Sequence, residues 1–210
     1  MKSHRIIAAL AASLLVASSV SAQNMTAFRG KPGSKVKIDG SGNVHDWTVE
    51  GHIIGGSLEL DSAFVNDPTK AAAGAKIPAK VEANIPTRSI KSGKSAMDDV
   101  MHDAMHAKEF PKISYRLTEL TLKSAPKSAE GPFEFDSVGE LAVSGKTNQI
   151  KMPVRMEKID KANVKTSGNT TLKMTSFGIK PPAPKLALGL IHTDDDVKIT
   201  FEWLTGAAEK

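Results

Sequence analysis

The sequence predicts an all-β fold of antiparallel strands, closed into a barrel or packed as a sandwich. Apolar and polar residues alternate with period two through most of the chain, the pattern of strands with one buried face. None of these stretches is a continuous apolar run, which disfavours a parallel sheet buried on both faces. Cysteine is absent, so the fold must be held by a full-sized core and not by disulfides.

The N-terminus has the pattern of a secretory signal peptide. Lys2 and Arg5 precede an uncharged apolar run over 6–20, and small residues end it at Ala22. The run is shorter than the roughly 20 residues that cross a bilayer core. We therefore expect cleavage before Gln23, no integral membrane span, and a periplasmic or extracellular location.

About eight or nine strands are expected after this leader. Pro153 has outward parity within its strand, which indicates an edge or bulged position. In chain order, the inward-facing residues expected are Val36 and Ile38; Trp47, Val49 and Ile53; Leu58 and Leu60; Val81, Ala83 and Ile85; Ile113, Tyr115 and Leu117; Phe133 and Phe135; Leu141 and Val143; Ile150, Met152, Val154 and Met156; Leu172 and Met174; and Val197, Ile199, Phe201 and Trp203.

One segment, 95–108, predicts a helix laid across the barrel. Ser95 is placed to cap its N-terminus with Asp98 three residues later, and Pro111 prevents its continuation. The methionines that recur every four residues would share one face of this helix: Met97, Met101 and Met105. Three segments rich in small and turn-forming residues are expected to be irregular, namely 62–76, 123–132 and 178–190.

The charge balance excludes one class of partner. The chain has 28 Lys+Arg against 23 Asp+Glu, and removal of Lys2 and Arg5 leaves 26 against 23, a net charge of +3. The lysines are interleaved with acids and form no basic cluster with aromatic residues. Nucleic-acid binding is therefore not expected.

Two histidines raise the question of a metal site. His102 and His106 lie four residues apart on the predicted helix, with Asp98 one turn earlier, a spacing that could hold zinc or nickel. The zinc-protease signature needs Glu directly after the first histidine, and Asp103 stands there. An exposed polar helix face explains the same residues, so His102 and His106 are only weak metal candidates.

Catalysis is not expected. No Gly-x-Ser-x-Gly motif occurs, and His45 and Asp46 are neighbours in a strand, so their side chains point to opposite faces. The acidic run over 193–196 lacks the glycine and distal glutamate of a calcium loop.

Four motifs in order along the chain carry a resemblance to a known family. They are NIPTRSI at 84–90, HDAMHAKEFPKISY at 102–115, GELAVSGKTNQIKMPV at 139–154 and TSFGI at 175–179. With them the chain resembles the YceI-like family of exported lipid-binding proteins over roughly residues 34–204. The sequence departs from the family's early-strand pattern at 44–47, where it reads Val-His-Asp-Trp.

The resemblance implies a lipocalin-like, extended antiparallel β-barrel of about eight strands with one short helix, its lumen holding a polyisoprenoid or similar amphiphilic chain. It divides the chain into a leader (1–22), a lead-in (23–33), the barrel (34–204) and a tail (205–210). Alternation by itself reports burial and not vacancy, so a packed interior would explain the same pattern. Methionine suits a site for a long flexible chain, because its side chain adapts to irregular shapes.

The expected lumen residues are Trp47, Val49, Leu58, Leu60, Ile85, Met101, Met105, Ile113, Tyr115, Phe133, Phe135, Met152, Phe177 and Phe201, and a polar head group would meet Arg88, Lys91 or Lys94. Besides a bound lipid, no cofactor is expected, and a homodimer is left open. Two alternatives stay open as well: a periplasmic metal- or stress-related binding protein that uses the His102/His106 helix, and a structural barrel with a filled interior.

Overall fold

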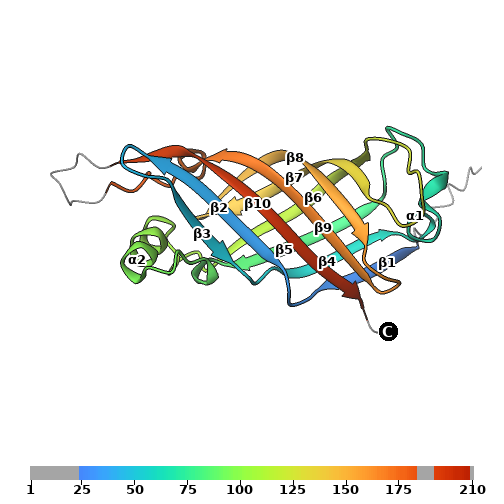
Figure 1. Cartoon of the computed structure of the whole chain (residues 1–210), viewed down its shortest axis with the longest axis horizontal. Helices are drawn as coiled ribbons and strands as arrows, with labels where there is room; N and C mark the ends of the chain where they lie inside the picture. The colour runs from blue at the N-terminus through green and yellow to red at the C-terminus, as the bar shows by residue number, and fades with distance from the viewer. Residues whose placement is uncertain (1–23, 184–191, 209–210) are drawn as a thin grey trace, which may run out of the picture.

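The computed structural model of the chain describes residues 24–183 and 192–208 and has the predicted all-β architecture (Figure 1). The predicted leader lies outside the described residues. Ten strands run along an elongated barrel: β1 (Met25–Gly30), β2 (Lys35–Gly42), β3 (Trp47–Gly51), β4 (Gly55–Asp61), β5 (Ala79–Pro86), β6 (Lys112–Leu122), β7 (Phe133–Val143), β8 (Lys146–Lys158), β9 (Asn163–Lys173) and β10 (Thr193–Ala207).

The barrel is closed by antiparallel pairing. Strands β1, β4, β5, β6, β7, β8, β9 and β10 form a ring of eight, which β1 closes by pairing with β10. The two further strands, β2 and β3, pair with each other and extend the sheet from β10. Because β1 and β10 supply the closing pair, the barrel extends beyond the predicted 34–204 at both ends.

The break between β3 and β4 changes which residues face inward. Trp203 donates from Nε1 to the Ile54 carbonyl at 3.1 Å, and this buried hydrogen bond fixes the break to β10. Gly30 is required beside it, because a Cβ there would lie 2.8 Å from the Ile54 oxygen. The prediction that Ile53 faces inward is therefore wrong: Ile53 is exposed and Ile54 is buried, since the parity of the strand shifts across the break.

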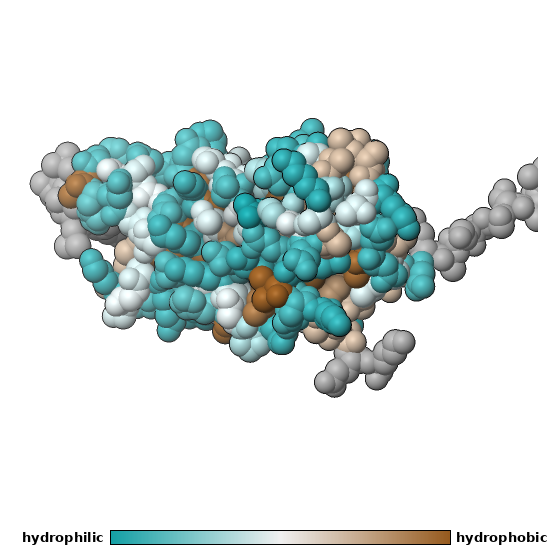
Figure 2. Space-filling model, turned by 45° about the vertical axis from the view of Figure 1, so that its right-hand side comes forward, coloured by the Kyte–Doolittle hydropathy of each residue, from teal (hydrophilic) through white to brown (hydrophobic). Residues whose placement is uncertain are grey.

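Inside β6 the alternation shifts once more, at a bulge between Leu117 and Glu119, after which Leu120 and Leu122 are the buried residues. Along most of the other strands it holds, and the outward residues make a polar exterior. Exposed ion pairs join neighbouring strands, such as Lys35 with Glu50 at 2.9 Å and Arg116 with Glu140 at 2.7 Å. The face in Figure 2 is mainly hydrophilic, with only isolated apolar side chains. Exposed pairs of this kind add little stability, so the fold depends on its interior.

Helices occupy the two ends of the barrel (Figure 1). At one end lie α1 (Ser62–Asn66) and the 3₁₀ helix η1 (Pro68–Lys70), where the sequence predicted an irregular segment. At the other end lie α2 (Ser95–Ala104) and the 3₁₀ helices η2 (Thr87–Ser89) and η3 (Met174–Phe177). No helix in the described part of the chain is long and apolar enough to cross a bilayer.

The boundaries predicted for α2 are partly wrong. The helix ends at Ala104 and not at 108, because His106 adopts a left-handed backbone with φ 50°. Lys94, not Ser95, is the N-cap residue, and the Asp98 carboxylate reaches past it to accept from the Ser92 N–H at 2.6 Å. The helix does begin where the sequence predicted, but Asp98 accepts its hydrogen bond from Ser92 in the turn before the helix and not from the N-cap residue.

The interior differs between the two halves of the barrel. In the half beside α1, which we call the packed half, Phe64 makes edge contacts with Phe133 and Phe135 at centroid distances of 5.5 and 5.9 Å. Phe28, Leu60 and these rings belong to one buried cluster. The half beside α2 and η3, which we call the cavity half, contains a large open space.

Candidate ligand-binding cavity

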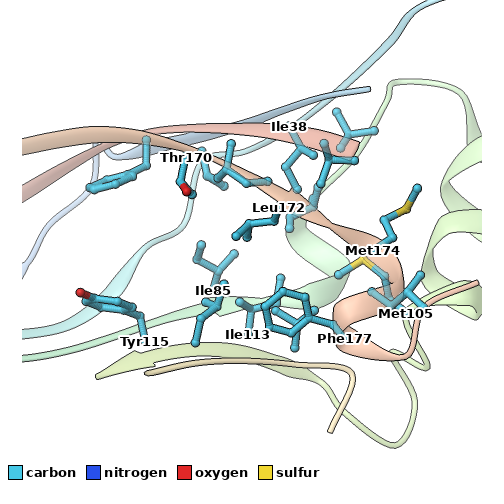
Figure 3. Close-up of a pocket in the computed structure, with 18 of the residues that line it drawn as sticks. Ile38, Ile85, Met105, Ile113, Tyr115, Thr170, Leu172, Met174 and Phe177 are labelled. Atoms are coloured by element: carbon cyan, nitrogen blue, oxygen red, sulfur yellow. The ribbon is translucent and has the colours of Figure 1, made fainter. Parts of the chain in front are cut away.

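The cavity half holds a cavity of about 590 Å³ with an almost entirely apolar lining (Figure 3). Its wall comes from the inward faces of the strands, and α2, η3 and the connecting segments near them supply most of the rest of the lining. A volume of this size lies within the range of ligand sites in proteins. The structure therefore excludes a barrel filled throughout.

Three aromatic rings in the cavity wall each cover a glycine of the neighbouring strand. A Cβ on Gly139 would lie 2.4 Å from the Tyr115 hydroxyl, and one on Gly168 would lie 2.8 Å from the Phe201 ring. Gly40 has the same relation to Trp47. Glycine thus lets each ring lie against the wall, and a larger residue would have to displace it toward the lumen.

Methionine is concentrated around the cavity. Of the eight methionines in the chain, six line it: Met97, Met101, Met105, Met152, Met156 and Met174. Met105 packs with Phe177 and Ile179 in a small cluster separate from the main core, at the end of the cavity that we call its mouth (Figure 3). The mouth is therefore bordered by long, flexible side chains.

Near the mouth, the wall of the barrel is completed by segments outside the strands at two places, beside β8 and β9 and beside β3. Pairing between β8 and β9 begins only at Val154, directly after Pro153. Proline has no backbone N–H to donate, so Pro153 stands where the pairing with β9 stops, which agrees with the edge or bulged position predicted for it. The 3₁₀ helix η3 packs beside both strands, and Asn148 donates to the Ser176 carbonyl at 2.8 Å. On the other side, β3 is bridged to Lys91 through Glu50.

Helix α2 is fixed to the barrel by two buried polar side chains. His102 contacts the Ile90 carbonyl through Nε2 at 2.9 Å, and Asp98 accepts from both the N–H and the hydroxyl of Ser92. Burial alone would raise the pKa of the Asp98 carboxyl. The Ser92 hydrogen bonds, with the nearby His102 and Lys91, hold that pKa below its ordinary value instead.

Charged side chains line the cavity only sparsely. Among the described lining residues there is no Asp or Glu, and the lysines are Lys94, at the start of α2, and Lys173, at the end of β9. Lys173 is paired with Asp196 at 3.0 Å. His45 and His192 also line the cavity and are exposed.

Polar hydroxyl groups reach the inner end of the cavity. Ser137 donates to the Met152 carbonyl at 2.9 Å, whereas the Tyr115 and Thr166 hydroxyls are buried without a hydrogen-bond partner among the described residues. Burial raises the pKa of the Tyr115 hydroxyl, and the nearby Ser137 hydroxyl only partly offsets this. The cavity is thus apolar along its length but has hydrogen-bonding capacity at depth.

Most predicted lumen residues do meet at this cavity. Three do not: Leu60, Phe133 and Phe135 belong to the packed half, where Leu60 and Phe133 border a separate pocket of about 570 Å³ beside α1, which charged residues such as Glu157 and Lys158 also line. Those that line the cavity are Trp47, Val49, Leu58, Ile85, Met101, Met105, Ile113, Tyr115, Met152, Phe177 and Phe201.

The predicted polar contacts need correction. Arg88 and Lys91 are exposed and do not line the cavity, whereas Lys94 does. His102 is buried against Ile90, and His106 lies beyond the end of α2, so the two do not share a helix face. The described residues contain no group of three or more His, Asp or Glu that could hold a metal ion.

Several lining residues were not predicted. The inward threonines of β9, Thr166 and Thr170, were missed because the sequence of β9 reads as polar on both faces. Ser137 was missed because it is a polar residue in the inward-facing series of β7, whose other predicted members are apolar. Parity along each strand, applied without regard to polarity, would have found all three.

The family model described as YceI-like domain matches residues 29–203. A polyisoprenoid-binding domain from Saccharophagus degradans, implicated in plant cell wall breakdown, superposes with a TM-score of 0.65 at 12% identity, over 88% of this chain and 100% of that one. A search of curated proteins found no match.

Two further solved structures share the fold. BcnA from Burkholderia cenocepacia has a TM-score of 0.59 at 20% identity, covering 81% of this chain and 95% of that protein. The YCEI protein of Campylobacter jejuni has a TM-score of 0.54 at 15% identity, covering 77% and 85%. At these identities the likeness establishes the barrel architecture.

Proposed function

This chain belongs to the YceI-like domain family, and we propose that it is an exported, non-catalytic protein that holds a polyisoprenoid or similar amphiphilic apolar chain in its cavity. The observation that carries the proposal is the cavity of about 590 Å³, lined along its length by apolar side chains. The structural relative from Saccharophagus degradans is described as a polyisoprenoid-binding domain, which supports the same class of ligand.

The energetics favour a long apolar ligand. Burial of apolar surface contributes about 25 cal/mol per Å². A chain of several isoprenyl units therefore exceeds the several kcal/mol of translational and rotational freedom lost on binding. Such a ligand needs shape and apolar contact more than ion pairs, which fits a lining without carboxylates among its described residues.

Two features support storage or transport in place of catalysis. The Ser137 hydroxyl, a possible nucleophile by type, donates to a backbone carbonyl and not to a base. His45 and His192, which line the cavity, are exposed. Export is supported by the signal-peptide pattern over 1–22, and no arrangement of the described residues favours the metal-binding alternative.

The test is to identify what fills the cavity. The full chain, expressed with its leader, is purified without detergent and measured by native mass spectrometry, then extracted with organic solvent. We expect an added mass that extraction removes and that matches a chain-like lipid. A protein of unmodified mass that also fails to bind added geranylgeraniol would overturn the proposal.

The matched control is a blocked cavity. Ala83 lines the cavity from β5, and phenylalanine at this position would occupy the space that a ligand needs. Purified Ala83→Phe should carry no added mass. Retention of the same lipid by this variant would place the lipid elsewhere on the protein.

A further inference from the structure

The inner end of the cavity carries an unusual set of hydroxyl groups. Ser137 on β7 and Thr166 on β9 line the cavity, while the next inward residues of their strands, Phe135 and Val164, belong to the packed core. These two hydroxyls therefore stand on the floor of the cavity, where it meets the packed half.

The Tyr115 hydroxyl reaches the same floor from β6. Its oxygen lies against Gly139, two residues from Ser137 on β7, and Ser137 is close enough to affect the Tyr115 pKa. Figure 3 shows Tyr115 at the opposite end of the lining from Met105 and Met174. Three hydroxyls from three different strands thus reach one end of an apolar cavity.

Two of these hydroxyls have no partner. Ser137 is satisfied by the Met152 carbonyl, but Tyr115 Oη and Thr166 Oγ1 are buried and make no hydrogen bond among the described residues. Thr166 is only 7% exposed. A buried hydroxyl without a partner is destabilising, and such groups are rare in folded proteins. Their presence in a ligand cavity indicates a ligand atom that completes them.

We propose that the floor formed by Tyr115, Ser137 and Thr166 binds the uncharged, oxygen-bearing end of the lipid, so that the ligand enters head first. The Tyr115 and Thr166 hydroxyls donate to this oxygen, and the hydrocarbon chain extends past the apolar wall to the methionines of the mouth. The inference deepens the proposed function and rests on it, since it assigns the polarity and the direction of the same ligand.

The charge distribution excludes an ionised group on the floor. The lysines of the described lining, Lys94 and Lys173, belong to the mouth, and Lys173 is already paired with Asp196. An anionic phosphate placed on the floor would be buried without a counter-charge, which is strongly unfavourable. A hydroxyl, carbonyl or ether oxygen meets the two free hydroxyls without that penalty.

Three ligands with one carbon skeleton test the proposal by equilibrium binding to the protein from Gln23 to its C-terminus. They are geranylgeraniol, the hydrocarbon with the same skeleton, and geranylgeranyl diphosphate. Wild-type protein should bind the alcohol more tightly than the hydrocarbon. Tyr115→Phe and Thr166→Val should each weaken alcohol binding about fivefold and change hydrocarbon binding less than twofold.

A matched control separates the floor from the rest of the lumen. Thr170 lies on the same face of β9, four residues nearer the mouth, so Thr170→Val should leave the affinity for the alcohol unchanged. An equal loss for alcohol and hydrocarbon in the floor variants, or no loss for either, overturns the head-first proposal. So does diphosphate binding that is tighter than alcohol binding and is abolished by Lys94→Ala.

The two proposals fail in different ways. If wild-type protein binds none of the three ligands, the lipid-binding function itself is wrong. If it binds the hydrocarbon as tightly as the alcohol, the function stands and the floor assignment alone is wrong.

Discussion

The packed half and the cavity half are built by the same strands and the same alternation, yet aromatic rings pack together inside the first, whose own pocket beside α1 is partly polar, while the second holds a long apolar cavity. In the packed half, Phe64 of α1 makes edge contacts with Phe133 and Phe135. The cavity half contains most of the methionines, and its aromatic rings lie over glycines of neighbouring strands. Whether one end of this barrel holds an apolar cavity therefore depends on the inward side chains there and on the helix that covers that end.

The difference also assigns tasks. Rigid aromatic rings in the packed half supply stability, because they bury large areas at low cost in conformational entropy. Flexible thioethers around the cavity adapt to a ligand of irregular shape. We therefore expect mutations in the two halves to separate stability from binding.

Removing a side chain from each half should give the largest contrast. Phe135 is completely buried, so Phe135→Ala should lower the free energy of unfolding by about 3–5 kcal/mol. Met152 already faces the cavity, so Met152→Ala should cost less than half as much. Urea titration of both variants measures the difference, and equal losses would mean that the cavity is collapsed in solution.

Filling each half should produce opposite effects from the same substitution. Ala79 and Ala83 share one face of β5 and both pack against the main core, but only Ala83 also lines the cavity. Ala83→Phe should lower lipid affinity by more than tenfold with little change in stability. Ala79→Phe should lower stability by about 1–3 kcal/mol and keep lipid affinity, since overpacking strains a filled core.

Either result reversed would contradict the contrast. Denaturant titration and geranylgeraniol binding on the same two proteins give both readouts. Loss of binding in Ala79→Phe, at a urea-free condition where it is folded, would show that the packed half also holds ligand.

Weakening the attachment of α2 should loosen the mouth alone. The Asp98 pKa is lower in the folded protein than in the unfolded chain, so its stabilising effect is present above the ordinary carboxyl pKa and is lost as pH falls through the lower, folded value. Asp98→Asn should speed hydrogen exchange at the Ser92 amide on the order of fivefold at neutral pH. It should leave exchange in β7 unchanged.

The pH profile provides the check. The difference in Ser92 exchange between wild type and Asp98→Asn should shrink as the medium is made strongly acidic, because the wild-type carboxylate becomes protonated. A difference that persists undiminished below the folded pKa would mean that charge at Asp98 has no part in holding α2.

The sequence predicts the wall of this barrel well and its contents poorly. Period-two alternation assigns a face to each residue, which is why Trp47, Ile85 and Ile113 were placed inside correctly. It failed at Ile53, where the strand breaks and the parity shifts. Alternation tells which side chains point inward only while the strand is regular. A break in the strand exchanges the inward and outward positions, and the composition does not reveal it.

What occupies the interior depends on distances that no local pattern contains. Phe133 and Phe201 both face inward from their strands, but Phe133 contacts Phe64 of α1 whereas Phe201 lines the cavity. The helix that makes this difference is only five residues long and has too few turns to show periodicity. Thr166 was missed for a related reason, since a polar inward residue looks like an interruption until its neighbours across the barrel are known.

The smallest expected effect concerns Tyr115, the single tyrosine of the chain, which reports on the cavity half alone. Burial raises the pKa of its hydroxyl, so it should ionise at a higher pH than tyrosine in the unfolded chain. Its contribution to stability is complete below the unfolded pKa and is lost as pH rises through the folded one. Absorbance during an alkaline titration follows this step, and Tyr115→Phe removes it. A bound lipid should move the step to still higher pH, because the ligand excludes the water that would solvate the phenolate. An ordinary tyrosine titration that lipid does not shift would place water, not ligand, at the floor of the cavity.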